Sequence, residues 1–316
     1  MTLAANTMAK PTRRAFLAGA SGCALALGCA SVRGEQQPFH TVRVGELEVT
    51  VVSDGNLLVP TPLLATNVQE TTLRAALGTA ANRVEPPCNV TLVRTAKDFI
   101  LIDTGSGPHF MPTAGRLLAN LERAGIKPEQ ITKVVFTHGH PDHLWGTLDE
   151  FDDSLNFPNA EHIIPAAEWN FWSNEGAEAL LPDDRKTFAR PAAKILSKIK
   201  HQARTVTPGD DVAHGLRCID MAGHTAGQVA IELASGTDSL LVVADTLTHT
   251  LVSFAHPDWT PAADHHDREQ AVRMRLRLLD RLATDRARFV GFHLPFPGIG
   301  RVTRTGTAYR YEADAA

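Results

Sequence analysis

The sequence predicts an α/β fold in which two β-rich halves pack together with helices on the outside, an αββα sandwich. Short apolar runs typical of strands occur in both halves of the 316-residue chain, and amphipathic helical patterns lie between them. No internal repeat or low-complexity linker divides the chain, which is long enough for one large core. We therefore expect one domain over residues 31–316, preceded by a targeting segment over residues 1–30.

The first half begins with two hairpin patterns. Residues 40–53 alternate between apolar and polar side chains around a Gly45-Glu46 turn, and residues 89–94 and 99–102 form a second such pair. Between the hairpins, residues 60–87 are irregular except for a short helical pattern at 72–80. An insertion of this length is typical of a lid or of a dimer contact, so a homodimer is one of its two interpretations. An amphipathic helix is expected at 113–124, before Gly125, and a buried strand at 133–136.

The second half mixes the same kinds of element. Strands are expected at 160–164, 216–220, 228–233, 239–244 and 289–292. Helices are expected at 166–172, at 183–201 with a break before Pro191, and at 268–282. The residues after His293 are interpreted as a short tail.

The first 30 residues resemble an export signal. Residues 12–17 contain the pair Arg13-Arg14 and are similar to a twin-arginine motif, and a weakly apolar stretch rich in alanine and glycine follows at 15–32. Small residues before Ser31 suit cleavage, whereas the residues before Cys29 fit a lipoprotein signal poorly. We expect export to the periplasm and a mature chain without a stable membrane span. The alternatives are an uncleaved anchor and a chance Arg-Arg pair.

The composition limits the partners. The formal net charge is -4 and no basic run with interleaved aromatic residues occurs, so we expect no nucleic-acid partner. Fourteen histidines stand beside two tyrosines, and neutral imidazole is the commonest metal ligand. Beyond the signal only Cys88 and Cys218 remain, which leaves a disulfide or two buried free thiols open.

A dense group of metal-ligand candidates follows the strand at 133–136. The segment 137–143 reads Thr-His-Gly-His-Pro-Asp-His and offers four candidates: His138, His140, Asp142 and His143. The first two histidines need a turn between them to converge, because alternate residues of an extended segment point to opposite sides, and Gly139 permits that turn. Three more candidates follow apolar strands further along the chain: His224, Asp245 and His293. A surface loop with accidental histidines would not account for this series.

The series resembles the metallo-β-lactamase superfamily, from about Asp103 to His293. The resemblance implies two divalent metal ions, with zinc as the expected metal. One ion would be held by His138, His140 and His224, the other by Asp142, His143 and His293, and Asp245 would bridge them. Asp103 would support the site without ligating a metal. The implied chemistry is hydrolysis by a metal-bridging hydroxide, with Asp142 also accepting or passing on a proton.

The same resemblance limits the classes of reaction that we expect. A bridging aspartate such as Asp245 is typical of lactonases, thioesterases and phosphotriesterases rather than of β-lactamases. We therefore expect a small-molecule substrate: a lactone, a carboxylic ester or a phosphotriester. Segments 42–55 and 293–300 are similar to the branch of methyl parathion hydrolase and acyl-homoserine lactonases, although Thr248 stands where many of those lactonases have a helper tyrosine. A β-lactamase, a mononuclear iron dioxygenase of the same fold and a metal-binding scaffold without turnover are the alternatives.

Aromatic side chains near the ligands in the sequence are candidates for a substrate pocket. Trp145 follows the histidine motif, Trp169 and Trp172 lie on the helix expected at 166–172, and Phe296 follows the last ligand. Aromatic walls suit an apolar ester, lactone or aryl group, and packing in the core is the alternative role of these rings.

Overall fold

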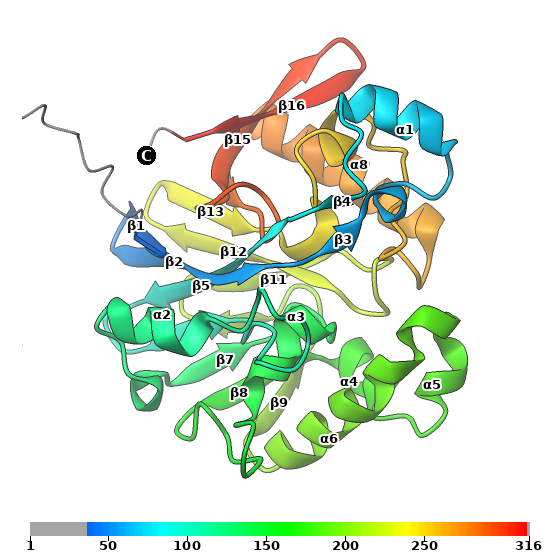
Figure 1. Ribbon diagram of the computed structural model, residues 1–316. Helices are drawn as coiled ribbons and strands as arrows, with labels where there is room; N and C mark the ends of the chain where they lie inside the picture. The colour runs from blue at the N-terminus through cyan, green and yellow to red at the C-terminus, as the bar shows by residue number, and fades with distance from the viewer. Residues whose placement is uncertain (1–36, 315–316) are drawn as a thin grey trace, which may run out of the picture. The chain divides into compact units, whose positions relative to one another are not determined.

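Two seven-stranded sheets form the framework of the computed structural model, which describes residues 37–314 (Figure 1). The predicted signal peptide lies outside the described residues. The first sheet has the strand order β1 (Phe39–Val44), β2 (Leu47–Asn56), β5 (Pro87–Arg94), β6 (Phe99–Ile102), β7 (Lys133–Val135), β8 (Glu161–Pro165), β9 (Ala203–Val206). The second has the order β10 (Asp211–Ala213), β11 (Leu216–Asp220), β12 (Val229–Ser235), β13 (Asp238–Val242), β14 (Arg288–Val290), β15 (Ile299–Thr305), β16 (Ala308–Ala313).

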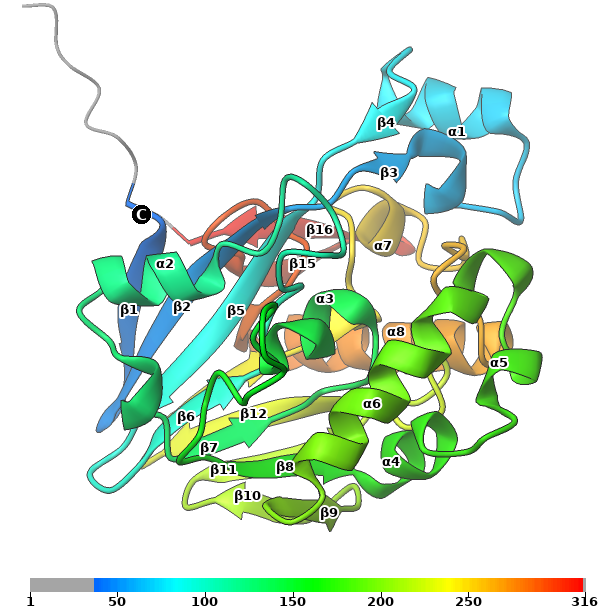
Figure 2. The ribbon, with the colours of Figure 1, turned by 60° about the horizontal axis from the view of Figure 1, so that its bottom comes forward.

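Helices cover the outer face of each sheet. Beside the first sheet lie α2 (Leu117–Arg123), α3 (Pro141–Leu144), α4 (Ala166–Trp172), α5 (Ala177–Leu180) and α6 (Ala189–Ile199), and beside the second lie α7 (Val252–Ala255) and α8 (Arg268–Asp285) (Figure 2). Short 3-10 turns connect them: η2 (Pro128–Gln130), η3 (Trp145–Thr147), η4 (Asp183–Phe188) and η5 (Ala244–Thr246). No helix in the described range 37–314 is long and apolar enough to cross a membrane.

Three apolar layers hold the sheets and helices together. Between the sheets, side chains such as Val51 and Ile100 of the first pack with Ile231 and Val290 of the second. Leu121 of α2 and Ile195 of α6 belong to the layer outside the first sheet. Leu278 and Leu282 of α8 pack with Phe289 outside the second sheet. The order of layers is therefore helix, sheet, sheet, helix, and the predicted αββα sandwich is confirmed.

Both predicted hairpins are confirmed, and their registers are regular. Val44 pairs with Leu47 across the Gly45-Glu46 turn, and Arg94 pairs with Phe99 at the second turn. From β6 to β9 the first sheet is parallel, so the carboxyl ends of β6 and β7 lie at the same edge. This edge is where the histidine motif begins.

Several element boundaries differ from those expected. The helix expected at 113–124 begins only at Leu117, because the carboxylate of Asp54 accepts the backbone N–H groups of Gly115 and Leu117 and holds the preceding residues in a loop. The segment 183–201 is divided after Phe188, and Pro191 lies in the first turn of α6, where its missing N–H costs no helical hydrogen bond. Helix α8 continues to Asp285.

The residues after His293 are not a tail. They form the antiparallel hairpin β15–β16, which completes the second sheet. Val302 and Tyr309 are buried against the layer that holds α8 in place. Burial of these two apolar side chains stabilises the packing of the hairpin against the rest of the second half.

The insertion at 60–87 has a small apolar core of its own. It contains β3 (Val59–Pro60), η1 (Thr61–Leu64), α1 (Glu70–Leu77) and β4 (Arg83–Val84). Leu64 and Leu73 pack against Val252 and Trp259 of the same chain. The homodimer contact stays a prediction.

Cys88 and Cys218 are free, buried thiols. Cys88 belongs to the apolar layer outside the first sheet, and Cys218 belongs to the layer between the sheets. Of the two alternatives left open by the sequence, the structure has free thiols rather than a disulfide.

Candidate metal centre

The histidine motif is held by the end of the neighbouring strand. Asp103 follows β6 with a φ of 65°, and its Oδ1 accepts a hydrogen bond from the backbone N–H of Thr137 at 2.7 Å. Its Oδ2 accepts a second from the Thr137 hydroxyl at 2.8 Å. The backbone N–H of Thr104 donates to the carbonyl of His143 at 2.8 Å. The ends of β6 and β7 therefore fix both ends of the motif.

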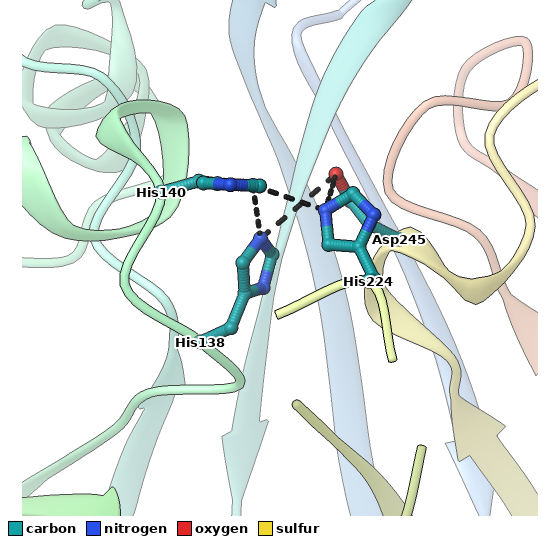
Figure 3. Close-up of side chains that lie close together, drawn as sticks. All are labelled: His138, His140, His224 and Asp245. Atoms are coloured by element: carbon teal, nitrogen blue, oxygen red, sulfur yellow. Dashed lines mark hydrogen bonds and ion pairs between the residues drawn. The ribbon is translucent and has the colours of Figure 1, made fainter. Parts of the chain in front are cut away.

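Four buried side chains form a first ligand group: His138, His140, His224 and Asp245 (Figure 3). Nε2 of His138 and Nε2 of His224 each lie 3.0 Å from Nδ1 of His140. Oδ2 of Asp245 lies 3.3 Å from Nε2 of His224 and 3.9 Å from Nε2 of His138. Burial lowers the pKa of His138 and of His140 well below the usual value, so both rings are neutral and can offer a lone pair.

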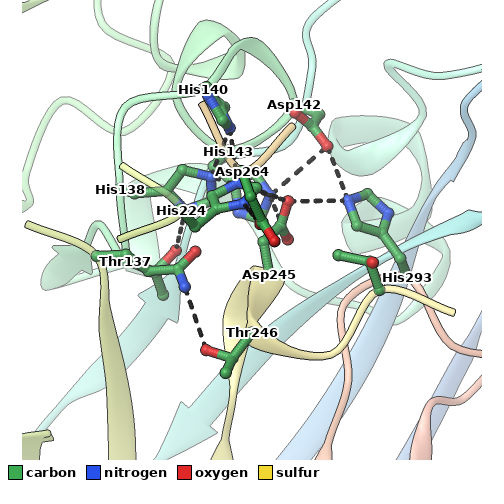
Figure 4. A network of polar contacts seen from close by, with 12 residues as sticks. Thr137, His138, His140, Asp142, His143, His224, Asp245, Thr246, Asp264 and His293 are labelled. Atoms are coloured by element: carbon green, nitrogen blue, oxygen red, sulfur yellow. Dashed lines mark hydrogen bonds and ion pairs between the residues drawn. The ribbon is translucent and has the colours of Figure 1, made fainter. Parts of the chain in front are cut away.

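A second group shares Asp245 with the first: Asp142, His143, Asp245 and His293 (Figure 4). Nε2 of His293 lies 3.2 Å from Oδ2 of Asp142 and 3.3 Å from Oδ2 of Asp245. Nε2 of His143 lies 3.1 Å from Oδ1 of Asp245. The structure thus brings together all seven ligand candidates that the sequence singles out, in two adjacent groups.

Three buried atoms of the second group make no hydrogen bond of acceptable geometry within residues 37–314, although polar atoms of the same group lie 3.1 and 3.2 Å away. They are Oδ2 of Asp142, Nε2 of His143 and Oδ1 of Asp245. A buried polar atom without a partner is costly, and a cation enclosed by these atoms would satisfy all three. Imidazole nitrogens with carboxylate oxygens are also a donor set that divalent transition metals accept. The two groups therefore fit two divalent ions.

Each ligand histidine is oriented through its other ring nitrogen. Nδ1 of His143 lies 2.8 Å from Oδ2 of Asp103, and Nδ1 of His293 lies 2.8 Å from the carbonyl of Pro87. Nδ1 of His138 lies 3.1 Å from the hydroxyl of Thr137. Such outer contacts fix the ring and its tautomer, leaving the inner nitrogen for a metal.

The two remaining ligand histidines, His224 and His140, have outer partners that are not predicted from the sequence. Oδ1 of Asp264 lies 2.9 Å from Nδ1 of His224, and Nε2 of His265 lies 2.9 Å from Nε2 of His140. Both residues lie in the loop before α8, and Asp264 is buried. The run Asp264-His265-His266 is a signal that could have drawn attention to this loop.

Glu168 is a third residue that sequence reasoning missed. Its buried carboxylate accepts hydrogen bonds from the backbone N–H of Gly139 at 2.9 Å and of Gly227 at 2.6 Å. The indole N–H of Trp172 donates to the same carboxylate at 2.8 Å. Glu168 therefore joins the loop of His138 and His140 to the loop of His224.

Gly139 is required here for space rather than for an unusual φ. A Cβ atom at this position would lie 2.2 Å from Nε1 of Trp172, and φ of Gly139 is not positive. Glycine at this position thus allows the Trp172 indole to pack closely against the loop between His138 and His140.

A cavity of about 340 Å³ opens beside the ligand groups. Four candidate ligands line it: His140, Asp142, Asp245 and His293. Much of the remaining wall is apolar and comes from three segments. Leu57 and Leu58 precede the insertion, and Leu63 and Leu64 lie at its start. Phe110 and Met111 belong to the loop before α2, and Phe188 belongs to η4. Thr248, Asp184 and Arg185 add to the polar part.

The four aromatic residues singled out from the sequence do not line this cavity. Trp145 packs edge-on against Phe110 and Phe188, with ring centroids 5.6 and 6.1 Å away, and so lies behind the wall. Trp172 is fully buried in the apolar layer outside the first sheet, and Trp169 packs against that layer. Phe296 packs against the layer between the sheets. Proximity in sequence to the ligands does not place these rings at the cavity, because the wall comes from other loops.

The sequence matches the metallo-beta-lactamase superfamily over residues 83–286. The chain belongs to the metallo-beta-lactamase superfamily. The matched segment carries six of the seven candidate ligands, and His293 lies just beyond it. The predicted family and fold are confirmed.

Two curated relatives match part of the chain. Metallo-beta-lactamase domain-containing protein 1 of Mus musculus is 41% identical over 66 residues, which cover 21% of this chain and 24% of that protein. A probable metallo-hydrolase of Mycobacterium tuberculosis is 25% identical over 191 residues, 51% of this chain and 57% of that protein. The chain thus spans about a quarter of the first relative and little more than half of the second.

Two solved structures are similar over most of the chain. AidC, a dizinc quorum-quenching lactonase in complex with a product, N-hexanoyl-L-homoserine, has a TM-score of 0.83 and 27% identity, covering 88% of this chain and 98% of AidC. AbOPH, a hydrolase of the beta lactamase superfamily, has a TM-score of 0.82 and 28% identity, covering 89% of this chain and 99% of AbOPH. The predicted class of enzyme, a metal-dependent hydrolase, agrees with the family and with both structures.

Proposed function

We propose that the protein is a binuclear metal-dependent hydrolase that opens the ester bond of a lactone carrying an apolar substituent. One observation carries the proposal: two ligand groups that share Asp245 lie at one end of a cavity whose other wall is largely apolar. An apolar cavity with a few convergent polar groups suits a small organic molecule. The similarity to AidC, whose bound product is a ring-opened lactone, supports a lactone over the other esters considered.

The residues fit the two ions as follows. His138, His140 and His224 would hold one ion, Asp142, His143 and His293 the other, and Asp245 would contribute to both. We propose zinc, because both groups offer imidazole nitrogens and carboxylate oxygens, and zinc accepts both kinds of ligand. When bound, two such ions lower the pKa of water to about 7 and polarise the carbonyl or phosphoryl oxygen of a substrate.

Asp142 has a second role in this proposal. Its carboxylate belongs to the second ligand group and also lines the cavity. It is therefore placed to hold the proton that an attacking water loses and to release it to the leaving oxygen. Thr248, which also lines the cavity, stands where many of the lactonases that the chain resembles have a tyrosine, and we assign proton delivery to the leaving oxygen to Asp142.

The export prediction stays part of this proposal. Arg13-Arg14 would direct the folded, metal-loaded protein to the periplasm. Replacing both residues with lysine should retain the protein in the cytoplasm, as measured by cell fractionation. Equal periplasmic amounts of the two forms would contradict a twin-arginine route.

The proposal is tested by assaying purified protein of known metal content on three substrates: an N-acyl homoserine lactone, an aryl dialkyl phosphotriester and a β-lactam. We expect two divalent ions per chain and a kcat/KM highest for the lactone. A preference for the phosphotriester would leave the binuclear hydrolase in place and overturn the lactone assignment. One iron per chain with oxygen consumption would overturn the hydrolase, since that is the behaviour of the dioxygenases with this fold.

A further inference from the structure

Arg185 is a cation in the wall of the metal-side cavity. It lies on η4 (Asp183–Phe188) and lines the same cavity as Asp142 and His293. Its side chain is only 14% exposed. A buried guanidinium next to a candidate reaction site needs an explanation, because removing a charge from water is costly.

The Arg185 side chain makes no hydrogen bond to any residue in the described range. Its Nε is buried and without a partner. The nearest carboxylate oxygen is Oδ2 of Asp184, 4.0 Å from Nε, and the Asp184 side chain is 61% exposed. The guanidinium carbon also lies 5.8 Å from the ring centroid of Phe188, a contact that leaves the N–H donors free. Arginine has five such donors and is always charged, so these donors are available to a ligand.

The surroundings of Arg185 favour a neutral acceptor over an anion. Asp184, which lies next to Arg185 in the same wall and is outside the ligand groups, would repel a carboxylate bound to Arg185. The rest of the wall is mostly apolar, and a second buried anion would have to lose its hydration there. A carbonyl oxygen costs much less to desolvate and accepts a strong hydrogen bond from a charged donor.

We infer that Arg185 is a specificity-determining residue that donates a hydrogen bond to a substrate carbonyl outside the bond that is cleaved. This inference rests on the proposed lactone hydrolysis. A lactone with an acylamino substituent has three parts that match the cavity: the ring ester for the metal ligands, the amide carbonyl for Arg185, and the acyl chain for the wall of Leu57, Leu63 and Phe188. An alkyl lactone lacks only the second part.

The experiment compares two lactones that differ in the amide alone. N-octanoyl homoserine lactone carries an acylamino chain on the ring carbon next to the carbonyl, and α-nonyl-γ-butyrolactone carries an alkyl chain of similar length there. Arg185→Met removes the donors, and Arg185→Lys keeps a charged group with N–H donors but not the planar guanidinium. Arg190→Met is the matched control, because the Arg190 side chain is 88% exposed on the neighbouring helix. Metal content is measured in every variant, so that a loss of metal is recognised.

For Arg185→Met we expect kcat/KM to fall at least roughly tenfold with the acylamino lactone, mostly through KM, and less than about threefold with the alkyl lactone. Arg185→Lys should recover part of the loss, and Arg190→Met should match the wild type on both substrates. Equal losses on the two lactones, or no loss on either, would overturn the assignment of Arg185 while the proposed function stands. If the wild type with two bound ions opens neither lactone, the proposed function fails, and this inference fails with it.

Discussion

Nη2 of Arg275 lies 2.5 Å from Oδ2 of Asp264, and both side chains are buried. The other oxygen of Asp264 faces Nδ1 of His224. The same guanidinium donates to the carbonyls of Thr246, Pro257 and Trp259. Through Asp264, Arg275 supports the loop of His224, and through the carbonyl of Thr246 it supports the loop of Asp245. One side chain of helix α8 therefore supports two loops that carry candidate ligands.

Arg275→Met should destabilise the protein strongly. Asp264 would remain as a buried charge without its cation, and three backbone carbonyls would lose a donor. The expected loss in the free energy of unfolding is about 3–5 kcal/mol, measured by urea unfolding of metal-free protein. Arg277→Met on the exposed side of α8 should change it by less than about 0.5 kcal/mol. Similar stabilities of the two variants would show that the buried pair does not support the fold.

Glu168→Gln should weaken the contact between the two ligand loops. Glutamine has one acceptor oxygen in place of two, so at least one of the three donors that Glu168 satisfies loses its partner. We expect a loss of about 1–3 kcal/mol in stability and a weaker retention of metal during dialysis against a chelator. Glu175→Gln, at an exposed position near the end of α4, is the control. Retention of metal equal to the wild type would argue against a positioning role of Glu168.

Gly139→Ala should disturb the first ligand group through a steric clash. The new methyl group would lie 2.2 Å from Nε1 of Trp172, and either the indole or the ligand loop must move. Overpacking of this kind costs about 1–3 kcal/mol, and we expect a lower metal content as well. Gly176→Ala, where the nearest atom is 3.4 Å away, is the matched change at a tolerant site. If both variants keep full metal occupancy and stability, the close contact of Gly139 is not required.

The two thiols should be unreactive in the native protein. Burial raises the pKa of Cys88 and of Cys218 to about 12, so neither is ionised at pH 8. An alkylating reagent at pH 8 should label neither position until the protein is unfolded, when both react. Peptide mass spectrometry locates the label. Rapid labelling of native protein at either cysteine would contradict its burial.

The candidate ligands could be singled out from the sequence because they follow apolar strands and because their order resembles that of the metallo-β-lactamase superfamily. His138, His224 and His293 are examples: local pattern alone marks the strand ends, and the sandwich brings those ends together. Asp264 and Glu168 could not be found in this way. They act by accepting hydrogen bonds from ring or backbone N–H groups of distant segments, and no sequence spacing reports such a contact.

The side chains that line the cavity could not be predicted from the sequence, for a related reason. Trp145 is adjacent to the ligand motif in the chain, yet Phe188 and Leu57 reach the cavity from segments far away. The packing of loops decides which side chains face a cavity, and loop packing is not periodic. The β15–β16 hairpin, by contrast, carried a readable signal, because Gly306 separates two stretches of alternating side chains.

Asp245 belongs to both ligand groups at once. Metal analysis of Asp245→Asn beside the wild type tests most directly whether it bridges two ions. The wild type should bind two divalent ions per chain. The variant should bind fewer and lose at least roughly tenfold in lactone hydrolysis, because removing the shared carboxylate weakens both groups. Two ions per chain and unchanged turnover in the variant would show that Asp245 does not bridge the groups.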